Sequence, residues 1–219
     1  MLFSFFRKNK KNIRQENIDK NKKIGGDIGY HKLEEWWMNE FTEEEREIVR
    51  ETYKPFGESE DFVIDEGEIL ETSASRVHFL CFAIGGYTSY EKFNIGKKFL
   101  EKAESLIEEE NDIINVHFVY HYGIELYYSN RDKINGALDG AIEYCKKQIS
   151  ISEEVKKAYL SKDKFLPTHR GFKQLAIIYE KQGEIEKAIE VTNLALEQGW
   201  NEDSERRLQR LEKKLLKNK

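Results

Sequence analysis

The sequence predicts an all-α protein. Its 219 residues include only two prolines, the residue that most strongly breaks helices, and they are rich in Glu, Lys, Leu, Ile and Ala, which favour long helices. The chain is 39% hydrophobic and 12% aromatic, so it can bury a core although 35% of its residues are charged. Apolar and small residues recur at helical spacing in segment after segment.

Residues 1–29 are predicted to form a basic, flexible tail and linker. Eight Lys and Arg residues lie between Phe5 and Ile24 against two acidic residues, and a glycine-rich run ends the segment. Four apolar residues precede these charges, which leaves open contact with an anionic membrane or nucleic acid. This order is the reverse of a secretory signal, and no apolar run is long enough for a transmembrane segment, so we expect a cytoplasmic protein.

Residues 30–72 are predicted to be a helical N-terminal cap followed by an acidic loop. Two short helices fit the first half, and Thr42 with Glu45 three residues later has the form of a capping box. Pro55 ends the second helix, and the acidic stretch after it reads as a loop whose apolar residues 62–64 dock locally. Such a segment would cover one end of a helical array.

The strongest pattern lies in residues 73–202, where a spacing of aromatic and small residues repeats. Its best copy starts at Thr168, after a break at Pro167. The pattern residues of this copy are Phe172, Leu175, Ala176, Tyr179, Gly183, Ala188 and Ala195. Small residues at a helix crossing let two backbones approach, while large residues beside them fill the groove. The copy therefore predicts two closely packed helices joined by a turn.

This copy resembles a tetratricopeptide repeat (TPR), a helix-turn-helix unit of about 34 residues. The resemblance is closest over residues 171–200, with Thr192 in place of the usual bulky residue and Trp200 in place of the usual proline. Residues 36–211 also resemble a family of bacterial hypothetical proteins with TPR-like C-termini, which bears on the fold alone. The resemblance implies a right-handed α-α superhelix, a TPR-like solenoid of about three helix pairs with helical caps. It also implies a protein that binds a partner.

Two further copies lie upstream. The intervals of nine and then seven residues between core positions of the best copy recur between Tyr87, Gly96 and Ala103. They predict helices over about 73–90 and 94–110.

The third copy lies between these two and is longer. Its first helix contains Tyr127 and its second contains Ala141, and five extra residues between them predict an extended loop over 129–140. Ser152 is predicted to begin another helix. Residues 203–219 are predicted to be a C-terminal capping helix, because four leucines recur there at helical spacing.

When the TPR spacing is laid on the three copies, an alignment that we call the repeat frame, the first helix of each pair faces a concave groove. The candidate partner-binding residues are those at the groove-facing positions of these first helices. They are His78, His121, Glu125, Tyr128, Arg170, Lys173, Ile177 and Glu180. Arg170 and Lys173 make one end of the groove basic, which suits an acidic peptide because a guanidinium can pair with a carboxylate through two hydrogen bonds. The alternative, that these are ordinary solvated residues, stays open.

Two constellations allow a catalytic alternative. His117, His121 and Glu125 recur every four residues on one helix face, a spacing that can hold zinc or a base with its orienting group. His78 and Cys81 lie one turn apart, as a nucleophile pair would. Neither completes a motif, so we expect structural or ligand-contacting side chains from the first set and a semi-buried thiol from the second.

The sequence therefore predicts a non-enzymatic interaction module without a cofactor, whose partner is a protein or peptide, with an acidic peptide as a candidate. The net charge of −5 gives no reason to expect nucleic acid as the main partner. The first alternative is a small metal-dependent or Cys/His enzyme with its site on the groove. The second is an adaptor that meets a membrane or nucleic acid through the basic tail. The oligomeric state is not predicted.

Overall fold

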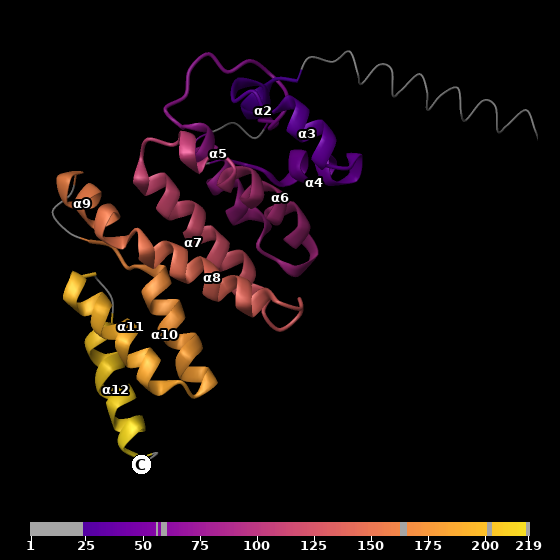
Figure 1. Cartoon of the computed structure of the whole chain (residues 1–219). Helices are drawn as coiled ribbons and strands as arrows, with labels where there is room; N and C mark the ends of the chain where they lie inside the picture. Colours follow the sequence, from indigo (N-terminus) through magenta and orange to yellow (C-terminus); the bar gives the residue numbers. More distant parts are fainter. Residues whose placement is uncertain (1–23, 56, 58–60, 163–165, 201–202, 218–219) are drawn as a thin grey trace, which may run out of the picture. The chain divides into compact units, whose positions relative to one another are not determined.

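The structure is a computed structural model that describes residues 24–55, 57, 61–162, 166–200 and 203–217 (Figure 1). All regular secondary structure in these ranges is helical, which confirms the all-α prediction. None of the described helices has the length and apolar character needed to cross a bilayer. The chain divides into two compact units, with the boundary between Glu71 and Thr72, and each unit is described by itself.

The first unit begins with α2 (Gly26–Tyr30), which corrects the predicted linker. The expected flexible segment was to run to residue 29, but this helix is formed and Ile28 is fully buried. Glycine allows it, because Gly26 has a φ of +55° and a Cβ there would lie 2.4 Å from the carbonyl oxygen of Ile64. The rest of the predicted tail, residues 1–23, lies outside the described residues.

The two short helices predicted next are α3 (Glu34–Glu40) and α4 (Glu43–Thr52). The capping box is confirmed: the Thr42 hydroxyl accepts the Glu45 N–H at 3.2 Å, and the Glu45 carboxylate accepts the Thr42 N–H at 2.8 Å. These bonds satisfy two backbone donors that a helix start otherwise leaves unpaired.

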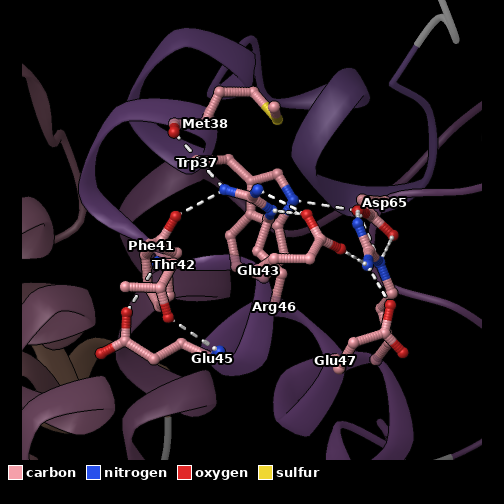
Figure 2. A network of polar contacts seen from close by, with 10 residues as sticks. Trp37, Met38, Phe41, Thr42, Glu43, Glu45, Arg46, Glu47 and Asp65 are labelled. Carbon is pink, nitrogen blue, oxygen red and sulfur yellow. Dashed lines mark hydrogen bonds and ion pairs between the residues drawn. The ribbon is translucent and has the colours of Figure 1, made fainter. Parts of the chain in front are cut away.

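The segment after α4 is held by one buried carboxylate, that of Asp65 (Figure 2). It accepts hydrogen bonds from Trp37 Nε1 at 2.9 Å and from Arg50 Nη2 at 2.8 Å. Arg50 also pairs with Glu43 and Glu47, at 2.7 and 2.6 Å. The predicted acidic loop is thus anchored to α3 and α4.

The second unit consists mainly of helix pairs. Successive pairs pack on one another, since α5 packs on α7 and α10 packs on both α7 and α8. The pairs are α5 (Arg76–Ile84) with α6 (Phe93–Glu104), α7 (Ile113–Ser129) with α8 (Ala137–Ser150), and α10 (Arg170–Gln182) with α11 (Ile185–Gln198). The remaining elements are η1 (Gly85–Tyr87), η2 (Tyr90–Lys92), η3 (Ile107–Glu109), α9 (Ser152–Lys162) and α12 (Ser204–Lys217).

The first pair is shorter than predicted. Its first helix was expected to run to residue 90 but ends at Ile84, where Gly85 and Gly86 lower helix propensity and the chain continues in the short 3₁₀ turns η1 and η2. The second helix was expected to reach residue 110 but ends at Glu104.

The second pair has a close crossing built from two glycines and two tyrosines. A Cβ at Gly123 on α7 would lie 2.5 Å from the Tyr144 ring, and a Cβ at Gly140 on α8 would lie 2.5 Å from the Tyr127 ring. The two rings stack with their centroids 5.4 Å apart. The extended loop predicted over 129–140 is shorter than expected, because α8 already begins at Ala137.

The third pair keeps its alanines at the helix crossing, where Ala188 and Ala195 are fully buried. Its first helix, expected to start at Thr168, starts at Arg170, because His169 is the N-cap and its side chain accepts the Phe172 N–H.

The closing helix α12 agrees with the capping helix predicted over 203–219 as far as residue 217, where the description ends. Its Leu211 is fully buried in a cluster with Ile185 and Ala188. Trp200 lies in a different cluster, formed with Val155, Leu166, Phe172 and Ala195.

Candidate functional site

The first helices of the three pairs carry side chains that touch one another from α5 across α7 to α10. We call this surface the first-helix face. It contains His78 and Phe82 of α5, Phe118, His121, Tyr122, Glu125 and Tyr128 of α7, and Arg170, Lys173, Ile177 and Lys181 of α10.

The α5–α7 end of the face is aromatic. Phe82 stacks on His78 with ring centroids 4.6 Å apart, and it meets Phe118 and Tyr122 at 5.8 and 5.7 Å. His78 is oriented by Asn115, whose amide oxygen lies 3.1 Å from Nδ1. Phe82 remains 46% exposed, so this end presents an aromatic surface that another molecule can cover.

Arg170 forms the centre of the α7–α10 end. Its Nη1 lies 3.3 Å from Nε2 of His121 and 3.3 Å from a carboxylate oxygen of Glu125. Burial, and secondly the charge of Arg170, lower the pKa of His121 to about 4, so this imidazole is neutral at pH 7. The structure thus brings three predicted site residues together, with Arg170 held against α7 rather than free in solvent.

Two cationic side chains contact Tyr128 near the C-terminal end of α7. Lys181 Nζ donates to the Tyr128 hydroxyl at 3.1 Å, and the Arg131 guanidinium lies over the Tyr128 ring, 4.3 Å from its centroid. On the same helix α10, Lys173 is exposed two turns before Lys181, and Ile177 between them is half-buried. This end of the face is therefore rich in positive charge.

Glu180 does not add a free negative charge to the face. Its carboxylate pairs with Arg210 at 2.6 Å and with Lys214, both on α12. The residue that the repeat frame assigns to the groove thus joins the last pair to the closing helix.

The proposed His78 and Cys81 pair does not have the geometry of a nucleophile and its base. The Cys81 Sγ donates to the backbone carbonyl of His78 at 3.2 Å, while the imidazole pairs with Asn115. Burial raises the pKa of the Cys81 thiol to about 12, so the thiol stays protonated at neutral pH. The sequence predicted a semi-buried thiol, whereas Cys81 is fully buried in the structure.

The three residues spaced by four on α7 have different partners. His117 is buried and lies 3.3 Å from the Gln148 amide nitrogen, whereas His121 and Glu125 contact Arg170. Within the described ranges, no three His, Cys, Asp or Glu side chains group in the manner of a metal site.

Sequence reasoning missed four members of the face: Phe82, Phe118, Tyr122 and Lys181. A signal for the first three was present, because Phe82 follows His78 by four residues and Tyr122 follows Phe118 by four. The repeat frame takes one residue from each turn and passes over these neighbours.

Comparison with known proteins identified no relatives. No protein-family model, curated protein or solved structure matches this chain.

Proposed function

We propose that the second unit is a TPR-like solenoid that binds a peptide segment of another protein on its first-helix face, without catalysing a reaction. Three successive helix pairs support the architecture, because each first helix packs beside the next and the third pair buries Ala188 and Ala195 at its crossing. The face supports binding, because it joins an exposed aromatic surface to a cationic one.

The observation that carries this proposal is the uninterrupted series of side-chain contacts from Phe82 through Tyr122 and His121 to Arg170. Aromatic and arginine side chains contribute most strongly to protein interfaces. Because α5, α7 and α10 hold them in one packed assembly, little ordering is needed when a partner binds.

Charge favours an acidic peptide. On the α10 side, Arg170, Lys173 and Lys181 outnumber Glu125, and Glu180 is neutralised by two cations of α12. An acidic segment placed there would gain complementary charge, and an apolar side chain of the same peptide would cover Phe82.

A peptide display library panned on the full-length protein tests the proposal. We expect enriched peptides to combine acidic residues with an aromatic or large aliphatic residue. Synthetic copies of these peptides, titrated by fluorescence anisotropy, should bind the Phe82→Ala and Lys173→Glu variants at least about tenfold more weakly than the wild type. The first substitution removes the apolar contact, and the second removes the complementary charge.

Lys157→Glu is the matched control, since Lys157 is an exposed lysine on α9 and gives the same charge change. It should leave the affinity within about twofold. Peptides that bind wild type, Phe82→Ala and Lys173→Glu equally well would refute the assignment of the face, and a library without enrichment would refute peptide binding.

A further inference from the structure

Two imidazoles are buried where the second helix pair meets the third. His117 on α7 is 2% exposed and His169, the N-cap of α10, is 0% exposed. Their ring centroids lie 5.1 Å apart, and the Trp200 ring lies 4.7 Å from that of His169. Neither imidazole belongs to the first-helix face.

The position of the proton on His117 follows from Gln148 on α8. The Gly171 N–H donates to Oε1 of Gln148 at 2.6 Å, so the amide nitrogen must point the other way, toward His117. That nitrogen donates to the His117 carbonyl oxygen at 3.1 Å and lies 3.3 Å from Nε2 of the ring. Nε2 therefore acts as an acceptor, and the single proton of the neutral ring sits on Nδ1.

The same reasoning applies to His169. Its Nδ1 accepts the Phe172 N–H at 3.4 Å and so caps α10, which places the proton on Nε2. Each imidazole thus turns a lone pair toward an N–H donor. A second proton on either ring would replace that acceptor by a donor and set N–H against N–H.

In the described part of the chain, the other nitrogen of each ring does not offer a hydrogen bond that would stabilise the charge of a second proton. Nδ1 of His117 and Nε2 of His169 have no hydrogen-bond partner within the described ranges. The titratable groups that act on the pair include His121 of α7, which lowers the pKa of both rings, and Tyr159 of α9, whose ring meets that of His117. Arg170 of α10 acts in turn on His121 and on Cys145 of α8. From α11, the residues packed on this cluster are the uncharged Ala195 and Val191.

The electrostatics agree with the geometry. Burial first, and then neighbouring His169 and His121, lower the pKa of His117 to about 2. Burial likewise lowers the pKa of His169 to about 3. A free carboxylate would favour a protonated, cationic imidazole, but the carboxylate of Glu125 is already paired with Arg170.

We propose that His117 and His169 form an acid-sensitive lock, which holds α10–α12 on α7–α8 at neutral pH and releases them as the pH falls below about 6. In the closed form both rings stay neutral. In the open form water reaches them and each takes a proton with an ordinary pKa near 6.5. Opening therefore binds two protons, and acid favours it.

Opening breaks the hydrogen bond that joins the two pairs, because Gln148 of α8 would release the N–H of Gly171 on α10. A His169 ring protonated on both nitrogens could no longer accept the Phe172 N–H, so α10 would also lose its own N-cap bond. The apolar cluster around Phe172 and Trp200 would then be exposed. The lock would thus turn acidification into exposure of an apolar surface.

Hydrogen exchange of the full-length protein, followed by mass spectrometry at pH 7.5 and pH 5.0 and corrected for intrinsic exchange rates, tests the lock. Two groups with an open-state pKa near 6.5 raise the opening constant about a thousandfold over this interval. Protection in α10 should fall by that order, while protection in α5 should fall by less than about tenfold. Equal loss in α5 and α10, or no loss in α10, would overturn the proposal.

Non-titrating replacements give the second test. In the double variant His117→Gln with His169→Asn, side-chain oxygens stand near the two acceptor nitrogens and cannot take up protons at these pH values. Protection of α10 in this variant should depend on pH by less than about tenfold, whereas the control His78→Asn should behave as wild type. If the double variant keeps the wild-type acid response, the lock is not formed by these residues.

A measurement on the wild type keeps the proposal testable if the double variant does not fold. The Cε1–H resonances of the five histidines, followed by NMR from pH 8 to pH 4.5, report the charge of each ring. The folded-state signals of His117 and His169 should not titrate in this range. Titration of either ring near pH 6.5 with the fold intact would refute the lock.

Discussion

Asp65→Asn is the sharpest test of the first unit. The substitution keeps the shape of the side chain but removes its charge and turns one acceptor oxygen into a donor. In the native unit the Asp65 side chain is 5% exposed and accepts hydrogen bonds from Arg50 and from the indole of Trp37. Because Trp37 and Arg50 Nη2 both donate to Oδ2, an amide oxygen at that place can keep these two bonds, but the NH₂ group at the place of Oδ1 then faces the Nε–H donor of Arg50.

The size of the expected loss in free energy of unfolding depends on the partners that Arg50 keeps. Breaking a buried ion pair costs about 3–5 kcal/mol when the surviving charge has no other partner. Arg50 keeps Glu43 and Glu47 and is 23% exposed, so we expect Asp65→Asn to lower the free energy of unfolding by about 2–3 kcal/mol. Asp65→Ala also leaves the buried Trp37 N–H unpaired and should cost a further 1–3 kcal/mol, roughly.

Urea unfolding followed by tryptophan fluorescence measures these changes. Asp61→Asn is the control, because it makes the same substitution at an exposed position of the same segment, and it should stay within about 0.5 kcal/mol of wild type. The reasoning is refuted if Asp65→Asn is as stable as wild type, or if Asp65→Ala costs no more than Asp65→Asn.

Three further substitutions probe individual contacts through thermal unfolding. Gly123→Ala should destabilise the second unit by about 1–3 kcal/mol, because the new Cβ meets the Tyr144 ring; an unchanged midpoint would show that the ring can shift. Ala188→Leu should cost a similar amount, roughly 1–3 kcal/mol, because a fully buried methyl must be replaced by an isobutyl group; wild-type stability would contradict the tight crossing. Thr42→Ala should cost the first unit about 1 kcal/mol through loss of the capping box with Glu45, and no change would mean that water replaces the cap.

Much of the helical layout could be predicted because its signals are local. Thr42 and Glu45 interact within one turn, and the leucine spacing that ends at Leu216 needs only the period of a helix. The helix α2 could not be predicted in this way, since Gly26 packs against the carbonyl oxygen of Ile64, far along the chain. A glycine-rich run seen alone reads as a linker.

The candidate site was predictable to the extent that it depends on the repeat frame. That frame placed Arg170, His121 and Glu125 on facing first helices, and the structure has them in contact. It contains no information on the closing helix, so the pairing of Glu180 with Arg210 was missed. Partner choice for a long charged side chain depends on tertiary packing, which no single helix pattern encodes.

The glycine and tyrosine crossing of α7 with α8 also bears on how this protein can vary. Each glycine accommodates one ring of the opposite helix, so Gly123 is matched to Tyr144 and Gly140 to Tyr127. Tyr144 is further tied to α6, because its hydroxyl donates to Glu104 at 2.6 Å. Among related sequences, a larger residue at position 123 should therefore be accompanied by a smaller one at 144 and by release of position 104, whereas positions 140 and 127 should vary together without involving 104.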